Sequence, residues 1–576
     1  MPIHNHNIAG MLNELADRLE MDGANAFRIR SYRNAAHSIH EMSRDISGMV
    51  ANKEDISQLP DVGKNMAEKI KVIVQTGQLD LLNELREKIP VDTKTLLQLT
   101  QLGPKRLKLL YDELGITTLK ELQEAAQNDQ IADLKGFGKK TQQKILEEIH
   151  KYLQQKDTVK RFKWAIAEQI ITPFLEYIKS HKDVLQAEIA GSYRRRKETV
   201  GDIDILIICN NAKSVMEHFV SYEEVKEILS HGSTKSSVIL VSGIQVDLRA
   251  ISKESYGSAL HYFTGSKEHN VAVRKIAVSK NLKINEYGIY KNDERLAGED
   301  EAGIYQQIGL QYIEPELREN RGEIEAAQKN SLPKLVTIND IKGDLQSHTT
   351  ASDGKYTLEE MAEAARKRGY EYFAITDHSK RVTMAHGLDD KRVLEQIEAI
   401  NKVNETYSDI TILKSMEVDI LKDGSLDLSN EVLKQLDIVV FAIHYYRNLS
   451  RDDQTNRVLK AMQNPYVHIM AHPTGRLIGK RDSYEIDMEK IIHAAKDNGC
   501  FLEINAAPER LDLSDIYAKM AKDVGVKLAI STDAHSEDNL NYMRFGVAQA
   551  RRAWLEPKDV LNTYSWTDLK QMIKRI

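Results

Sequence analysis

Two aspartates separated by one residue open an apolar run near the middle of the chain. They are Asp202 and Asp204, in the segment GDIDILIIC. In a β-strand the side chains of residues i and i+2 lie on the same side, so the two carboxylates face one point. A third carboxylate on a neighbouring strand would complete a site for two divalent ions. Asp247 in SGIQVDLRA fits because apolar residues alternate around it. The pattern predicts nucleotidyl transfer by two metal ions, with Mg²⁺ as the expected ion.

A turn upstream of this pair carries groups that bind phosphate. Gly191 and Ser192 would offer backbone N–H groups and a hydroxyl to the terminal phosphates of a nucleotide, with Arg195 close by. An isolated Asp-x-Asp pair is common at the ends of surface strands. The order of a Gly-Ser turn, an Asp-x-Asp pair and a later strand aspartate is much rarer and favours a nucleotidyltransferase.

In the C-terminal half, apolar segments end repeatedly in histidine or a carboxylate. The residues at these ends are His348, Asp353, His378, Glu417, His444, His472, Asp533 and His535. Imidazole and carboxylate together suit Mn²⁺ or Zn²⁺, and this many ligands would hold two or three ions for phosphoester hydrolysis. Helical segments such as residues 358–369 separate the apolar ones, so we expect parallel strands that close into a (β/α)7 barrel. The chemistry of such barrels lies at the carboxyl ends of the strands.

Three segments of the N-terminal part share a pattern that resembles the helix-hairpin-helix motif. They are LPDVGKNMAEKI (59–70), LTQLGPKRLKLL (99–110) and LKGFGKKTQQKI (134–145). Glycine allows the turn geometry and a close approach of the backbone, and the N–H groups of the following helix attract phosphate. The expected DNA contacts are Gly63, Lys64, Gly103, Lys105, Gly138 and Lys139. We expect an all-helical region that binds DNA without reading its sequence.

The composition sets wider limits. With 576 residues the chain should form several domains, and 41% hydrophobic and 29% charged residues are typical of globular proteins. No apolar run is long enough for a membrane span, and the N-terminus does not resemble a secretory signal. Only two cysteines occur, so we expect a reducing, cytoplasmic compartment. The net charge of −6 requires that any DNA-binding charge be local, as it is in residues 102–108, 135–140, 192–197 and 274–283.

Residues 256–290, YGSALHYFTGSKEHNVAVRKIAVSKNLKINEYGIY, resemble family X DNA polymerases of the DNA polymerase beta kind. The resemblance extends over about residues 7–318 and implies a palm with a thumb, gapped or nicked DNA, dNTPs and Mg²⁺. It adds nucleotide-binding roles for Gly201, Tyr262, Phe263, Gly265, Asn270 and Arg274. The YFTGS segment would cradle the incoming sugar and select against ribose. Asn270 and Arg274 would reach the nascent base pair from the minor-groove side.

Three further positions are singled out by the same resemblance. Gln245 and His269 depart from residues that are usual in the family, and neither change removes a metal ligand. Lys69 lies where the family places a lysine that forms a Schiff base with an abasic sugar. The alternative is that Lys69 is an exposed lysine on a helix.

The C-terminal half resembles the PHP domain of bacterial polymerases. That resemblance implies one ion on His348, Glu417 and Asp533. Glu417 would bridge to a second ion on His444 and His472. Asp353, His378 and His535 would hold a third. The usual His-x-His opening reads Gln346-Ser347-His348 here, and an amide oxygen is a poorer ligand than imidazole.

We therefore expect a multidomain, monomeric repair polymerase that fills short gaps. Its barrel would act as a 3′-5′ exonuclease, with AP endonuclease or 3′-phosphodiesterase activity in addition. The expected parts are 1–90, with helix-hairpin-helix and lyase-like features; 91–157, fingers; 158–255, palm; 256–318, thumb; 319–337, linker; and 338–576, PHP domain. One alternative keeps the polymerase and makes the barrel structural or regulatory. Another, a phosphatase of small molecules, accounts for the C-terminal half alone.

Overall fold

The computed structural model describes residues 5–40, 46–59, 61–97, 99, 102–154 and 161–573. Pro60, Thr100 and Gln101, which belong to two of the glycine-centred segments, lie outside the described residues. The chain divides into two compact units, Met1–Val159 and Lys160–Ile576. No helix among the described residues is long and apolar enough to cross a membrane.

The described part of the first unit is helical, as expected. Its elements are α1 (Asn5–Met21), α2 (Ala26–His40), α3 (Ile46–Ala51), η1 (Ile56–Gln58), α4 (Lys64–Thr76), α5 (Asp80–Lys88), α6 (Thr93–Leu96), α7 (Pro104–Leu114), α8 (Leu119–Gln127) and α9 (Lys139–Gln154). Apolar residues at helical spacing build two separate cores, one from α1–α5 and one from α6–α9. Gly77 and Gly115 end α4 and α7 in the left-handed conformation that glycine adopts without steric cost.

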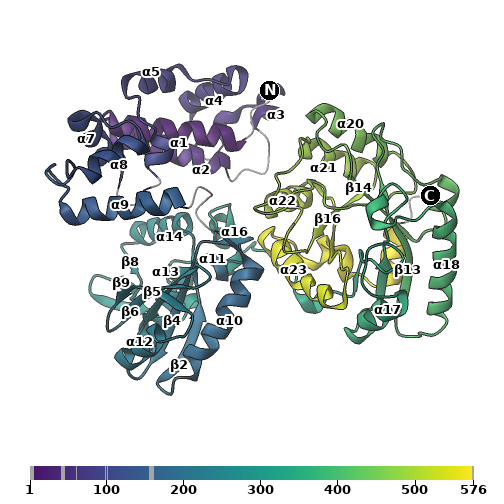
Figure 1. Cartoon of the computed structure of the whole chain (residues 1–576). Coiled ribbons are helices and arrows are strands. Elements are labelled where there is room, and N and C mark those ends of the chain that lie inside the picture. The colour runs from purple at the N-terminus through teal and green to yellow at the C-terminus, as the bar shows by residue number, and fades with distance from the viewer. Residues whose placement is uncertain are drawn as a thin grey trace. The chain divides into compact units, whose positions relative to one another are not determined.

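The second unit begins with a five-stranded mixed sheet and helices packed on it (Figure 1). β1 and β3 pair separately as a two-stranded sheet. The elements of both sheets are β1 (Phe162–Lys163), α10 (Trp164–Ser180), β2 (Val184–Ile189), α11 (Gly191–Arg194), β3 (Thr199–Val200), β4 (Asp202–Cys209), α12 (Ala212–Val220), β5 (Val225–His231), β6 (Lys235–Leu240) and β7 (Gln245–Ala250). The strand order is β2-β4-β7-β6-β5, and β4 pairs with β7 in parallel. The apolar residues of β4 and β7 alternate into one core with α10 and α12, which leaves the aspartates on the opposite side.

A smaller helical region with a three-stranded sheet follows. Its elements are η2 (Lys253–Ser255), α13 (Tyr256–Thr264), α14 (Lys267–Ser279), β8 (Lys283–Asn285), β9 (Gly288–Lys291), β10 (Glu294–Ala297), α15 (Glu301–Gln307), η3 (Pro315–Leu317) and α16 (Glu323–Gln328). Its core combines apolar residues of α14, α15 and α16 with those of β8, β9 and the segment that follows α15.

Seven parallel strands in the order β11 to β17 form the rest of the unit (Figure 1). The strands are β11 (Gly343–Asp344), β12 (Tyr372–Ile375), β13 (Thr411–Asp419), β14 (Ile438–Ala442), β15 (Ile469–Met470), β16 (Phe501–Asn505) and β17 (Leu528–Ser531). The helices are η4 (Ile338–Asp340), α17 (Leu358–Lys367), η5 (Thr383–Ala385), α18 (Asp390–Asn404), α19 (Asn430–Leu433), α20 (Arg451–Met462), α21 (Met488–Asp497), α22 (Asp515–Val524), η6 (Glu537–Tyr542), α23 (Met543–Arg552), η7 (Pro557–Asp559), η8 (Leu561–Thr563) and α24 (Trp566–Ile573). A bridge between Ser347 and Ala534 joins the ends of the first and last strands, so the barrel is nearly closed. The predicted barrel is confirmed.

A buried charge network joins the barrel to the palm and to the segment between them. Arg552 of α23 donates to the backbone oxygen of Arg195 at 2.8 Å, to Glu319 at 3.0 Å and to Asp515 at 2.7 Å. Arg195 donates to the same Glu319 oxygen at 3.1 Å. Burial opposes ionisation of Glu319, but Arg552 and Arg195 lower its pKa to about 2. The polar segment that was expected to be a linker thus holds buried ion pairs and α16; the boundary at 319–337 stays a prediction.

Candidate active sites

The three palm aspartates lie together on two neighbouring strands. Asp204 of β4 is directly opposite Asp247 of β7 in the parallel register, and Asp202 is opposite Gln245. Asp202 is exposed, whereas the other two aspartates are half-buried. The amide of Gln245 donates to Asp247 at 3.0 Å, so this departure from the family pattern orients one carboxylate.

Repulsion between these carboxylates shows how well the site suits a cation. Burial, together with the charges of Asp202 and Asp247, raises the pKa of Asp204 to about 6. Carboxylate oxygens gathered in this way are the ligands that Mg²⁺ prefers. The donor set therefore fits a hard divalent ion.

The phosphate-binding turn packs against the carboxylates. Gly191 begins α11 with φ +65°, and a Cβ atom there would lie 2.9 Å from Asp204 Oδ2. Glycine is needed for both reasons, and it brings the backbone of Ser192 beside the aspartates. Gly201 directly precedes β4. Arg195 is different: its side chain is buried between Glu319 and the backbone oxygen of Thr264, so its role in phosphate binding stays a prediction.

The residues expected around the incoming sugar also lie together. The amide nitrogen of Asn270 donates to the backbone oxygen of Tyr262 at 2.6 Å, and a Cβ atom at Gly265 would lie 2.7 Å from the Asn270 amide oxygen. That oxygen is buried and has no hydrogen-bond partner within the described part of the chain. Phe263 lies under the guanidinium of Arg249, 4.5 Å from its ring centre. Arg274 donates to the Asn270 backbone oxygen at 3.3 Å.

His269, the second departure, is a structural residue in this fold. It is fully buried, with Glu323 at 2.7 Å from Nδ1 and the Tyr305 hydroxyl at 2.9 Å from Nε2. Burial lowers its pKa even though Glu323 opposes the shift. His269 therefore fastens α14 to α15 and α16.

In the helical unit, Gly63 and Gly103 cap the N-termini of α4 and α7, and Gly138 directly precedes α9. None of the three has a positive φ, so the backbone does not need glycine for the turn itself. A Cβ atom at any of them would meet nothing within 4 Å. The missing side chain instead leaves open space in front of the helix starts.

The three predicted lysines and Lys69 lie on the same helices. Lys64 and Lys139 open α4 and α9, and Lys105 is in the first turn of α7. Lys69 lies on α4, half-exposed, 6.0 Å from the ring centre of Tyr32. Its nitrogen donates to the backbone oxygen of Asn65 at 3.3 Å. Schiff-base chemistry at Lys69 stays a prediction.

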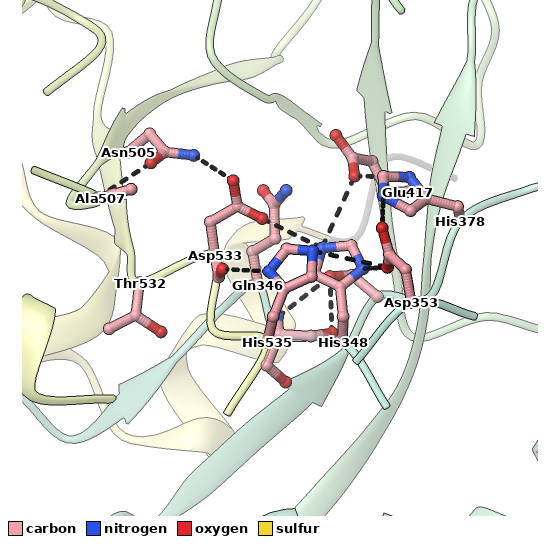
Figure 2. Close-up of polar contacts among 12 residues, drawn as sticks. Gln346, His348, Asp353, His378, Glu417, Asn505, Ala507, Thr532, Asp533 and His535 are labelled. Atoms are coloured by element: carbon pink, nitrogen blue, oxygen red, sulfur yellow. Dashed lines mark hydrogen bonds and ion pairs between the residues drawn. The ribbon is translucent and has the colours of Figure 1, made fainter. Parts of the chain in front are cut away.

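All eight predicted ligands of the barrel converge at one end of it, and Figure 2 shows His348, Asp353, His378, Glu417, Asp533 and His535 in one cluster. Each residue lies in a loop after its strand, apart from Glu417, which lies within β13. Two groups are close enough to share an ion. They are His348, Asp353, His378 and His535, and His378, Glu417 and His444.

Glu417 is at the centre of the cluster. One of its oxygens lies 2.9 Å from His472 Nε2 and 3.4 Å from His444 Nε2. The other lies 3.1 Å from His378 and 3.7 Å from His348. A carboxylate placed between four imidazoles is suited to bridge two ions.

The remaining contacts complete the cluster. His348 lies 3.1 Å from Asp533, and Asp353 lies 3.5 Å from both His378 and His535. The rings of His348 and His535 are stacked, with centres 4.3 Å apart (Figure 2).

These pairs neutralise one another electrostatically. Burial disfavours the charge on Glu417, but His444 and His378 hold its pKa well below its usual range. Burial likewise opposes the charge on His535, yet Asp353 and Asp533 raise its pKa to about 9. Only His472 has a lowered pKa among these imidazoles with resolved shifts, because of burial and the nearby Arg510.

Buried polar atoms without partners indicate room for ions. His472 Nδ1, His348 Nδ1 and both side-chain atoms of Gln346 are buried and accept or donate no hydrogen bond among the residues described. A buried polar group without a partner is costly, and an ion or its water ligands would satisfy it. The donor set fits transition-metal ions, and Gln346 lies with it (Figure 2).

Three residues around the ligands were not predicted. Asp419 accepts from the backbone N–H of His444 at 3.0 Å and lies 3.2 Å from its Nδ1. Asn505 donates to Asp533 at 3.0 Å, and Glu503 accepts from the backbone N–H of His472 at 2.7 Å. They orient ligands, as outer residues of metal sites do. Their signal was present in the strand-end segments MEVD and FLEIN, where an acidic residue is followed at i+2 by a second carboxylate or an amide.

Five segments of the chain match known protein families. Residues 3–79 match a helix-hairpin-helix domain and 93–151 a SAM-like helix-hairpin-helix tandem. Residues 164–256 match the DNA polymerase beta palm, 259–319 the DNA polymerase beta thumb, and 344–507 the PHP domain. Fold and sites together define a beta-type DNA polymerase joined to a PHP domain.

A DNA polymerase matches the whole chain, whereas probable phosphatases match about a third of it. The DNA polymerase/3′-5′ exonuclease PolX of Bacillus subtilis (strain 168) is 37% identical over 577 residues, which cover 100% of both chains. A probable phosphatase of Thermoanaerobacter sp. (strain X514) is 34% identical over 235 residues, 38% of this chain and 89% of its own. A probable phosphatase of Acetivibrio thermocellus is 31% identical over 201 residues, 33% of this chain and 78% of its own. The chain belongs to the PolX family of DNA polymerases.

Proposed function

We propose that this chain is a DNA polymerase with a 3′-5′ exonuclease, and that it fills short gaps during DNA repair. The observation that carries the proposal is the presence of two complete and separate ligand sets in one chain. Three carboxylates are in register on β4 and β7, and a histidine-carboxylate cluster lies at the strand ends of the barrel. Similarity to the PolX of Bacillus subtilis over the full length supports the combination.

For extension, Asp202, Asp204 and Asp247 would hold Mg²⁺. The bound ions would supply Lewis acidity at the attacking and leaving oxygens. Gly191 and Ser192 would position the phosphates through the turn that abuts Asp204. The YFTGS residues, with Asn270 and Arg274, would orient the dNTP and its template base.

For hydrolysis, the cluster would hold two or three ions of Mn²⁺ or Zn²⁺. His348, Glu417 and Asp533 would take one ion, and His444 and His472 a second that Glu417 bridges. Asp353, His378 and His535 would take the third. The substrate would be a 3′ end of DNA, with AP endonuclease or 3′-phosphodiesterase cleavage in addition.

The finer points of the proposal concern the DNA partner. The glycine-capped helices of the first unit would grip gapped or nicked DNA through its phosphates, with Lys64, Lys105 and Lys139 as charge partners. Lys69 would serve as the lyase nucleophile. We further propose that the protein acts as a monomer in the cytoplasm.

One gap-filling assay tests both activities. A 5′-labelled primer in a one-nucleotide gap is incubated with Mn²⁺, with and without dNTPs. Asp204→Ala and His378→Ala are run beside the wild type. The primer should extend with dNTPs and shorten without them, and each variant should lose only its own activity. Extension by Asp204→Ala would contradict the palm site, and shortening by His378→Ala would contradict the barrel site.

A second candidate makes the barrel a structural or regulatory module. Gln346 favours it, because it replaces an expected imidazole and leaves two buried polar atoms without partners in the described structure. Under this reading the wild type extends the primer but never shortens it, whichever divalent ion is supplied.

A further inference from the structure

Three arginines lie in loops at the end of the barrel that carries the metal ligands. Arg447 follows β14, Arg481 follows β15, and Arg510 follows β16. Loops after consecutive strands of a parallel barrel lie at the same end, so these arginines share the face of the metal ligands. None of them is a predicted ligand or nucleotide contact.

Arg447 and Arg481 donate to the same oxygen. The backbone carbonyl of Gly475 accepts from Arg447 Nη2 at 2.7 Å and from Arg481 Nη2 at 2.9 Å. Gly475 in turn donates its N–H to the backbone oxygen of His472 at 2.9 Å. One carbonyl thus holds two guanidinium groups close together, a single turn of chain away from a proposed metal ligand.

The positive charge of this pair is not balanced. No carboxylate of the described residues lies within 4.0 Å of either guanidinium. The nearby Asp512 instead accepts the backbone N–H groups of Thr474 and Gly475, at 3.0 and 2.8 Å. Burial, with the like charges of Arg447 and Arg510 in addition, lowers the pKa of Arg481 to about 10.

Arg510 connects the pair to the metal cluster. Its Nε lies 3.6 Å from Asp533 Oδ2, and its charge acts on both other arginines. Arg481 is exposed and Arg447 and Arg510 are half-buried, so the positive surface runs outward from Asp533 to solvent. Guanidinium groups in this arrangement suit a chain of phosphates better than a single small anion.

We propose that Arg447, Arg481 and Arg510 bind the phosphodiester backbone of the DNA strand whose 3′ end is hydrolysed at the barrel, at a phosphate next to the one under attack. The proposal rests on the proposed exonuclease function and adds the residues that hold its polymeric substrate. Backbone contacts of this kind carry no base information, so the grip is independent of sequence.

Two substrates separate backbone binding from cleavage. A single-stranded oligonucleotide presents flanking phosphates, whereas bis(4-nitrophenyl) phosphate presents only the bond to be cleaved. In the full chain, Arg447→Gln and Arg481→Gln should each raise KM for the oligonucleotide about ten- to hundredfold, as expected for losing a charged hydrogen bond. The salt dependence of log KM should fall by about one unit of slope. Hydrolysis of the small ester should be unchanged.

Arg366→Gln is the matched control. Arg366 is an arginine of α17 that is paired with Glu363 at 2.8 Å and Asp409 at 3.2 Å, away from the strand ends. This variant should match wild type on both substrates. An unchanged KM for the oligonucleotide in the cluster variants would overturn the proposal. Equal losses on both substrates would also overturn it, because the arginines would then act on the metal centre itself.

Arginine footprinting tests the site without relying on cleavage. Phenylglyoxal modification, read by mass spectrometry, is compared with and without an oligonucleotide whose 3′ linkages are phosphorothioates. Arg481 should be protected and Arg366 should not. If wild type cleaves neither substrate, the exonuclease proposal fails, and protection of Arg481 still decides the phosphate site. Equal modification of Arg481 with and without the oligonucleotide would refute it.

Discussion

The palm and the barrel gather metal-ligating side chains in opposite ways. In the palm, carboxylates face carboxylates, and burial together with their mutual repulsion raises the pKa of Asp204 to about 6. In the barrel, each carboxylate faces imidazoles, and these pairings lower the pKa of Asp353 and Glu417 although burial opposes the shift. The carboxylates of the palm site repel one another, whereas those of the barrel site are paired with imidazoles that bind protons.

The difference predicts different behaviour toward ions. An ion entering the palm relieves repulsion and displaces few protons at neutral pH. Ions entering the barrel must break hydrogen bonds between histidines and carboxylates and release the imidazole protons. The barrel cluster should therefore be stable without ions but strongly dependent on pH when it binds them.

The largest effect is expected from the central carboxylate of the barrel. Glu417→Ala leaves four imidazoles without their shared partner, so we expect exonuclease activity to fall at least about a thousandfold, or about 4 kcal/mol. Gap filling should be unaffected because the palm ligands are untouched. Both rates are measured on the same labelled primer. Near-normal exonuclease activity would remove Glu417 from the centre of the site.

Proton release on metal binding tests the comparison directly. The pKa of His535 is raised to about 9, and the pKa values of His378 and His444 are raised as well. Mn²⁺ affinity at the barrel should therefore weaken about tenfold per displaced proton for each pH unit below this range. Palm affinity should stay level until the pH approaches 6, where Asp204 takes up a proton.

Calorimetry in two buffers of different ionisation enthalpy measures these protons. The Asp204→Ala variant isolates the barrel, and His378→Ala leaves the palm intact. Equal proton release at both sites would break the contrast between them.

The thumb histidines extend the comparison because burial keeps them neutral, whereas the pKa values of His378, His444 and His535 in the barrel are raised. His261 and His269 are buried, and burial lowers both pKa values below 6.5. The folded thumb keeps them neutral, while the unfolded chain binds protons below about pH 6.5. Stability is thus complete above that pH and is lost on acidification, by about 1.4 kcal/mol per histidine per pH unit.

Hydrogen exchange of α14 amides at pH 5.5 and 7.5, corrected for intrinsic rates, follows this loss. His269→Gln should reduce the pH dependence, and barrel helices serve as the internal reference. A thumb equally protected at both pH values would contradict the assignment of neutral histidines.

The smallest effect is expected at Gln346. Gln346→His would supply an imidazole where two buried amide atoms now lack partners within the described chain. We expect Mn²⁺ to bind about tenfold more tightly, because imidazole is a better ligand than an amide oxygen. Titration of the full-length variant against wild type measures the change. Weaker binding would mean that Gln346 already serves the ions as it is.

Local patterns of the sequence were enough to predict the strands and their ligands. Asp202 and Asp204 are two residues apart on one strand, and His378 lies three residues after the end of β12. The alternation of apolar residues and the ends of strands are properties of short segments, so they can be recognised in the sequence without knowledge of the fold.

Pairings between distant segments could not be predicted in the same way. Arg195 and Glu319 are 124 positions apart, and Arg195 and Arg552 are 357 apart. Arg447 and Arg481 meet only because Gly475 turns its carbonyl toward both. Nothing in the spacing of these residues distinguishes them from arginines on a solvated surface.

The ion pairs of Arg552 bear on how such a protein can evolve. The same guanidinium serves the palm, through Arg195, and the barrel, through Asp515. A chimera that exchanged the barrel for one without this arginine would remove one of the three cationic partners of buried Glu319, leaving Arg195 and Lys197, and would destabilise the junction. Gene fission at this junction would face the same penalty in both halves. Exchange or separation of the two catalytic parts should therefore cost stability in both of them.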